Sequence, residues 1–137
     1  MKKSLVFGLS LATAALSVQA DELFVSINSA GAMAQGAGLV LAVQVLEQKV
    51  PVRVLLCDAA GDIAVAGKEM PALKPRNVTA QQILQSLLQA GAKVEVCALY
   101  LPNTGRQSSD LLPGVTPAKP ADVAAHLMKP GVRTLSF

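Results

Sequence analysis

Two cysteines are the side chains with the clearest chemical potential in this 137-residue chain. Cys97 lies in an apolar, strand-like run over residues 94–100, and Cys57 ends a second such run over residues 51–57. A residue at the carboxyl end of an interior strand lies where open α/β sheets place their ligands. The thiolate of such a cysteine is a nucleophile, whereas the same residue buried as a thiol is only a small apolar side chain. Cys97 is therefore the candidate catalytic residue, with core packing as its alternative.

Cys57 is a candidate second, resolving thiol, and packing at a strand end is its alternative. A disulfide with Cys97 is disfavoured if the first strand separates the two, as is usual in small folds of this type. The two backbones would then lie ~9.6 Å apart, twice the ~4.8 Å strand spacing, whereas a disulfide needs Cα atoms within ~7 Å. A two-cysteine redox pair requires the strand ends to move.

A reactive Cys97 needs a group that lowers the pKa of its thiol, such as a cation, a helix amino terminus or backbone donors. The nearest candidates in sequence are Arg106 and the turn over residues 103–105. We predict that one of them activates Cys97; an unchanged thiol pKa in Arg106→Ala would remove Arg106 from that role.

The sequence lacks the residue patterns of metal sites, nucleotide-binding loops and serine hydrolases. Cys57, Asp58, Cys97 and His126 contain no short pair of ligands, so we predict no metal site. The glycines over residues 31–36 have P-loop spacing without the Lys-Ser/Thr that grips phosphate. No nucleophile elbow of a serine hydrolase is present. We therefore predict no metal or organic cofactor.

Strands and helices are predicted to alternate. Apolar strands at 23–28, 51–57 and 94–100 are separated by helical patterns at 33–48 and from a cap at Asn77 or Thr79 to Gly91. A helix at 121–128 precedes a last strand at 132–137. Asp58 and Asp62 are predicted turn formers, and residues 102–120 have a linker-like composition. Nearly continuous apolar strands favour a parallel sheet covered on both faces. We expect a small three-layer α/β/α domain with four or five mostly parallel strands.

Residues 1–20 have the pattern of a secretory signal peptide, with two lysines, an apolar stretch and small residues before Asp21. About 14 apolar residues are too few for the alternative, a membrane anchor. We predict one mature domain over residues 21–137, periplasmic or secreted, with no membrane partner after cleavage. Without its two lysines the ten remaining Lys and Arg against nine acidic residues give a net charge of +1. These cations are scattered, which argues against a nucleic-acid partner.

The mature chain resembles the DsrE/DsrF-like sulfur-relay family. The resemblance covers the strands and turns over residues 23–28 and 52–57, and it is sharpest in QAGAKVEVCA at 89–98. It continues in LLPGV at 111–115 and in the final strand. The resemblance implies a DsrE-like α/β/α fold that assembles as homo-oligomers, often trimers or hexamers. It also implies that Cys97 carries sulfur as a persulfide without a cofactor.

The function that we expect is therefore acceptance or relay of sulfane sulfur on Cys97 in an exported protein. Its partner would be a sulfur donor or acceptor protein, or a small sulfur compound. Two alternatives remain open: a non-enzymatic oligomeric binding module with a buried Cys97, and a thiol-redox protein in which Cys57 resolves Cys97. Alkylation of Cys97 in the native protein distinguishes most of these hypotheses.

Overall fold

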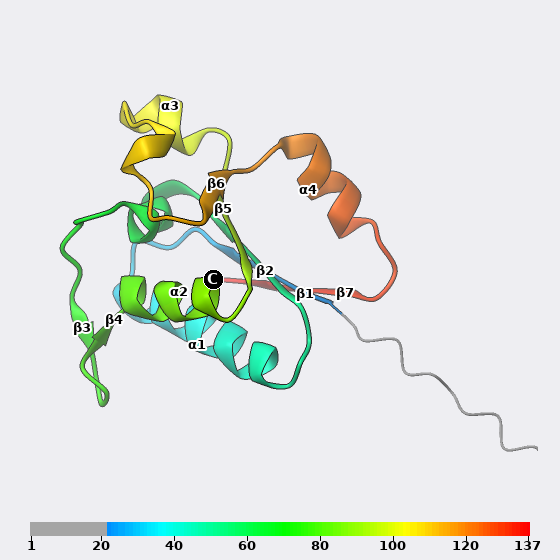
Figure 1. The fold of residues 1–137 in the computed structure, drawn as a ribbon, viewed down its shortest axis with the longest axis horizontal. Helices are drawn as coiled ribbons and strands as arrows, with labels where there is room; N and C mark the ends of the chain where they lie inside the picture. Colours follow the sequence, from blue (N-terminus) through cyan, green and yellow to red (C-terminus); the bar gives the residue numbers. More distant parts are fainter. Residues whose placement is uncertain (1–21) are drawn as a thin grey trace, which may run out of the picture.

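A computed structural model of the chain describes residues 22–137, so the predicted signal peptide lies outside the described residues. The fold is built on a parallel five-stranded sheet in the order β6-β5-β2-β1-β7 (Figure 1). Its strands are β1 (Glu22–Ile27), β2 (Val52–Leu56), β5 (Lys93–Val96), β6 (Val115–Pro117) and β7 (Val132–Ser136). The predicted α/β class and parallel sheet are confirmed.

Four α-helices and several short elements connect the strands. The helices are α1 (Ala32–Glu47), α2 (Ala80–Gln89), α3 (Tyr100–Thr104) and α4 (Pro120–Leu127). Two short 3-10 helices, η1 (Asp58–Ala64) and η2 (Ser108–Asp110), and a small hairpin, β3 (Ala72–Leu73) with β4 (Val78–Thr79), are the other elements of residues 22–137. The stretch predicted as a linker thus contains η2 and β6, which forms one edge of the sheet.

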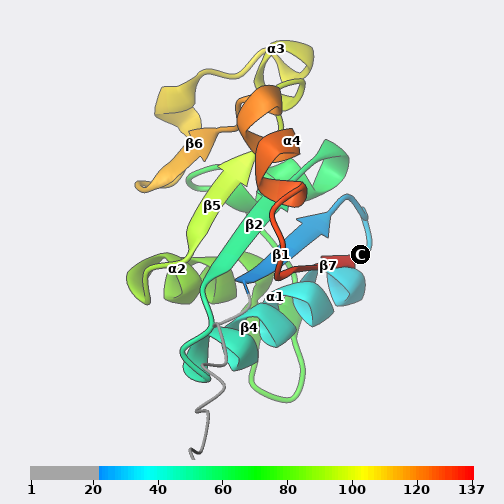
Figure 2. The ribbon, with the colours of Figure 1, turned by 90° about the vertical axis from the view of Figure 1, so that its right-hand side faces the viewer.

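The helices lie on both faces of the sheet (Figures 1 and 2). Helices α1 and α2 lie side by side on one face, where Leu23, Val25 and Ile27 join Leu39 and Leu84 in the buried core. Successive residues of a strand point to opposite faces. Phe24 accordingly points to the other face, where its ring packs against His126 of α4, with ring centroids 5.8 Å apart. The sheet is therefore the middle of three layers, as predicted.

The strand order predicted around the first strand is wrong. β2, not β1, lies in the centre and pairs with both β1 and β5. The connections through α1 and α2 both lead in the same direction across the sheet, and right-handed connections of that kind place their helices on the same face. Helix α1 suits this arrangement because it is apolar on most sides, and its Gly36 and Gly38 allow close contact with Leu73 and Phe137.

Two local signals in the sequence are confirmed around α2. Thr79 caps the helix through a reciprocal capping box, in which Gln82 N donates to Thr79 Oγ1 and Thr79 N donates to Gln82 Oε1. Gly91 follows the helix with φ +92°, a conformation that favours glycine. The helix therefore ends where the chain must turn into β5, whose last residue directly precedes Cys97.

The face under α4 also buries charged residues. Arg53 and Glu95 are each about 4% exposed, and Arg53 Nε donates to Glu95 Oε2 at 2.7 Å across the β2–β5 pair. Lys93 Nζ lies 3.2 Å from the other oxygen of Glu95. A buried ion pair of this kind tolerates the loss of both charges better than the loss of one. The pair joins β2 and β5, the two strands that precede the cysteines, on the sheet face that α4 covers.

His126 makes the stability of this layer sensitive to acid. Burial lowers the pKa of His126 below its ordinary 6.5, against the opposite effect of the Glu22 carboxylate. The unfolded chain therefore takes up the proton at higher pH than the folded chain, so stability is lost as pH falls below 6.5. We expect the wild type to lose stability relative to His126→Gln between pH 7.5 and 5, by at most ~1.4 kcal/mol per pH unit. Denaturant titrations at each pH measure this difference, and parallel curves for the two proteins would contradict it.

Within residues 22–137, none of the helices has the length and apolar character needed to cross a membrane.

Candidate functional site

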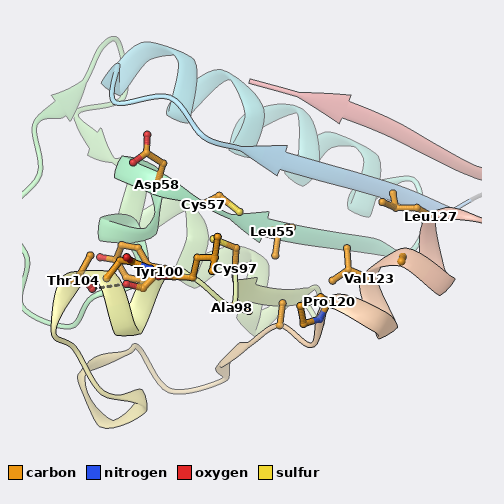
Figure 3. Close-up of a pocket in the computed structure, with 14 residues that line it drawn as sticks. Leu55, Cys57, Asp58, Cys97, Ala98, Tyr100, Thr104, Pro120, Val123 and Leu127 are labelled. Carbon is orange, nitrogen blue, oxygen red and sulfur yellow. Dashed lines mark hydrogen bonds between the residues drawn. The ribbon is translucent and has the colours of Figure 1, made fainter.

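An open pocket of about 750 Å³ lies at the carboxyl ends of β2 and β5, on the face that carries α4 (Figure 3). Its walls come from the ends of these two strands, from α3, from Ala118 before α4 and from the whole length of α4. The lining residues are Leu55, Cys57, Asp58, Cys97, Ala98, Leu99, Tyr100, Asn103, Thr104, Ala118, Pro120, Val123, Ala124 and Leu127. Both cysteines singled out in the sequence therefore line the same pocket.

Cys97 directly follows β5 and is partly exposed. Its backbone N–H donates to Leu56 O at 2.8 Å, and its carbonyl accepts from Tyr100 N at 2.9 Å. The first bond extends the β2–β5 ladder by one residue, and the second begins α3. The chain is thus held on both sides of the thiol, while the side chain faces the pocket between the sheet and the helices (Figure 3).

Cys57 follows β2 at the equivalent position. The last paired residues of the two strands are Leu56 and Val96, so the two cysteines are the next residues in register. Adjacent strands are ~4.8 Å apart, within the ~4.4–6.8 Å that disulfides span between Cα atoms. The predicted separation of ~9.6 Å is therefore wrong, because it placed β1 between these strands. The strand spacing therefore allows a Cys57–Cys97 disulfide, and both thiols are free in this structure.

The two thiols differ in their electrostatic surroundings. Burial, followed by a hydrogen bond and charge repulsion with the Cys97 sulfur, raises the pKa of Cys57 from an ordinary 9.0 to about 12. Cys57 therefore remains a protonated thiol at neutral pH. A protonated thiol can donate a hydrogen bond to the neighbouring sulfur, whereas it is a poor nucleophile. The raised pKa therefore disfavours Cys57 as the nucleophile of the pair.

Tyr100 anchors α3 at the other end of the pocket. Its hydroxyl donates to Asp62 Oδ1 at 2.6 Å, and its ring lies against Gly61, where any side chain would overlap it. The bond from Tyr100 is the main cause that lowers the pKa of Asp62, while burial, followed by Asp62, raises the pKa of Tyr100 to about 12. The carboxylate of Asp62 and the phenol of Tyr100 are therefore a fixed acceptor and donor.

Arg106 does not line the pocket. Its guanidinium lies 3.8 Å from Asp62 Oδ1, and Lys68 Nζ lies 3.1 Å from Oδ2 of the same carboxylate. Its predicted role in activating Cys97 therefore has no contact to support it in this structure, and it stays a prediction. Of the predicted 103–105 turn, Asn103 and Thr104 do reach the pocket, as residues of α3.

Several residues of the site were not identified from the sequence. The sequence pattern places Tyr100 at the end of a strand and Asp62 in a turn, yet their side chains form a hydrogen bond across 38 positions. Val123 and Leu127 carry the helical spacing of i and i+4, which shows a common helix face but not what that face covers. His126 of α4 packs against Phe24 and does not line the pocket. In the described part of the chain, no group of three or more His, Cys, Asp or Glu is suited to hold a metal ion.

Solved structures share this fold. The chain is similar to the ychN protein from E. coli, with a TM-score of 0.73 and 21% identity over 85% of this chain and 99% of that one. It is also similar to MTH1491, a protein of unknown function from Methanobacterium thermoautotrophicum, with a TM-score of 0.65 and 15% identity over the same shares of the two chains. No family model matches, and no curated protein matches by sequence. The likeness confirms the α/β fold with its mostly parallel sheet.

Proposed function

We propose that this chain is an exported, DsrE-like sulfur carrier in which Cys97 accepts sulfane sulfur and holds it as a persulfide. The observation that carries the proposal is the Cys97 thiol in an open pocket at the end of β5, fixed by the backbone on both sides. The resemblance of residues 89–98 to the sulfur-relay family supports the same role. The periplasmic or secreted location rests on the pattern of residues 1–20.

The reaction needs only thiol chemistry. The Cys97 thiolate attacks the outer sulfur of a donor persulfide, R–S–SH; a bond forms to Cys97 Sγ, and the donor S–S bond breaks. The electron pair leaves on the donor as R–S⁻, which takes up the proton released by Cys97. Transfer to an acceptor thiol repeats the same step with Cys97 as the leaving group. A donor or acceptor, either a protein or a small sulfur compound, is therefore the only partner that the step requires.

Cys57 is suited to protect the persulfide. A second thiolate beside Cys97 would attack the persulfide, form a Cys57–Cys97 disulfide and release sulfide. The raised pKa of Cys57 keeps this thiol protonated and slow to attack. A hydrogen-bonding Cys57 beside a nucleophilic Cys97 therefore favours carriage of sulfur over its internal release.

The proposal is tested by loading the purified protein with polysulfide and measuring intact mass. The wild type is expected to gain at least one sulfur atom per chain, and Cys97→Ser none. Cys57→Ser is the matched control because it removes a thiol from the same pocket, and it is expected to gain sulfur. Equal loading of the wild type and Cys97→Ser would overturn the proposal.

A two-cysteine redox function is a second candidate, favoured by the position of both thiols at the ends of paired strands. In that reaction Cys97 attacks a partner disulfide and Cys57 then displaces the partner's thiol, so two cysteines are oxidised as one partner disulfide is reduced. Peptide mapping without reductant distinguishes the two candidates. A reducible Cys57–Cys97 bond formed during turnover supports the redox function, and its absence in a protein that carries persulfide excludes it.

We also propose that the chain forms a homo-oligomer through α1. Met33, Val40 and Leu41 are large apolar residues that this helix leaves exposed. They lie at i, i+7 and i+8, on one face of the helix. Contiguous apolar patches of this kind mark interaction sites. Light scattering during gel filtration is expected to show more than one chain per particle, and a smaller particle for Leu41→Glu; a monomeric wild type would contradict this.

A further inference from the structure

The pocket that holds the thiols is unusually poor in positive charge. Of the fourteen described residues that line it, none is Lys, Arg or His, and the only formal charge is the negative one of Asp58. Most of the remaining lining is aliphatic or Pro, from the strands and from α4. An anion entering this pocket would lose water without gaining a cation, and such a transfer is costly.

Four cations of the neighbouring elements are paired elsewhere, and Lys119, exposed beside Pro120, is itself not among the residues that line the pocket. Lys68 and Arg106 face the carboxylate of Asp62. Arg53 and Lys93 face Glu95, which lies below the pocket on the α4 side of β5. None of these four residues is among those that line the pocket.

The amino terminus of α4 does not supply the missing attraction for an anion. Pro120 is its first residue and has no N–H to offer, and Asp122 places a negative charge in the first turn. The side chains that this helix presents to the pocket are instead apolar. They are Val123, Ala124 and Leu127.

The pocket has two ends with the thiols between them (Figure 3). At one end Tyr100 and Thr104 of α3 supply hydroxyl groups, and Thr104 Oγ1 donates to Tyr100 O at 2.7 Å. At the other end Leu55 of β2 faces Val123 and Leu127 of α4. A molecule whose sulfur reaches Cys97 can therefore extend an apolar group toward α4.

We propose that the site prefers sulfane-sulfur compounds that carry an apolar organic group, such as alkyl persulfides reacting in their protonated form R–S–SH, over donors whose organic group bears an anionic charge. This inference rests on the proposed role of Cys97 and names the substrate class of the same site. The alkyl group packs between Leu55 and the Val123–Leu127 face of α4, and the outer sulfur of R–S–SH lies at Cys97. Transfer leaves R–S⁻, which is protonated and released as the neutral thiol.

Methanethiosulfonates test this selection because they share one reactive group and differ only in their tail. The Cys97 thiolate displaces methanesulfinate from CH₃SO₂–S–R and forms the mixed disulfide Cys97–S–S–R, so atoms and charge balance. Rates for an n-butyl tail and for a sulfonatoethyl tail are measured on the purified protein by peptide mapping, which separates Cys97 from Cys57. Each rate is divided by the rate of the same reagent with 2-mercaptoethanol.

The n-butyl reagent is expected to be favoured at Cys97 by about tenfold or more after this correction, because only the sulfonate tail must be desolvated without a partner. Leu127→Lys places a cation at the apolar end and is expected to move the ratio toward the sulfonate by several-fold. Leu127→Met is the matched control and is expected to keep the wild-type ratio. A corrected ratio near one, or an unchanged ratio in Leu127→Lys, would overturn the inference.

The outcome is separable from that of the polysulfide experiment. Sulfur loading of Cys97 without preference for the butyl tail would leave the carrier function intact and refute the substrate class. A strong preference for the butyl tail without sulfur loading from any donor would support an apolar binding pocket and refute the carrier function.

Discussion

Glu95→Ala is expected to lower the free energy of unfolding by roughly 3–5 kcal/mol, the range found when one partner of a buried ion pair is removed. The substitution leaves the Arg53 guanidinium buried without the carboxylate that accepts its Nε at 2.7 Å. Arg53 Nη2 already has no hydrogen-bond partner, so the remaining charge would have little else to bind. Urea denaturation of the wild type and the variant measures the difference.

The matched control removes both charges. The double variant Arg53→Met, Glu95→Leu keeps the side-chain volume between the sheet and α4 and leaves no buried charge from this pair. Because apolar replacement of a whole buried pair is often neutral or stabilising, it is expected to recover most of the loss. A loss below ~1 kcal/mol in Glu95→Ala, the size typical of exposed pairs, would show that solvent reaches this pair.

Cys57 is expected to react with iodoacetamide at least about tenfold more slowly than an ordinary thiol at neutral pH. Only the thiolate reacts, and the pKa of Cys57, raised from an ordinary 9.0 to about 12, lowers the thiolate fraction, while the greater reactivity of a more basic thiolate offsets part of this loss. Partial burial slows access further. Peptide mapping after timed alkylation of the native protein gives the rate for each cysteine separately.

Unfolding supplies the control for this measurement. In urea both cysteines lose their surroundings, and their alkylation rates are expected to converge. The rate at native Cys57 is also expected to keep rising with pH above 9, where an ordinary thiol is already largely ionised, because the pKa of Cys57 is raised. Native rates at Cys57 as high as those in urea would contradict the protonated state on which the asymmetry of the pair depends.

The elements of this fold were largely predictable because their signals are local. The Thr79 capping box and Gly91 define α2 from residues a few positions apart, and the apolar runs before Cys57 and Cys97 identify β2 and β5. The position of both thiols at strand ends follows from the same patterns.

The order of the strands was not predictable in this way, because local signals do not determine which strands pair. Whether β1 or β2 lies in the centre depends on whether α1 and α2 cover the same face of the sheet. Helix α1 is apolar on most sides, so its pattern does not indicate which of its faces packs against the sheet. The same limit applies to Tyr100 and Asp62, which meet only because η1 and α3 follow neighbouring strands. The error reversed the argument about Cys57, from a separate thiol to the neighbour of Cys97.

The most direct test of the carrier role is to locate the added sulfur after polysulfide treatment. The loaded protein is alkylated, digested with trypsin and analysed without reductant, which separates residues 94–106, with Cys97, from residues 54–68, with Cys57. We predict an additional sulfur atom on the Cys97 peptide and none on the Cys57 peptide. An additional sulfur on Cys57, or on neither peptide, would contradict it.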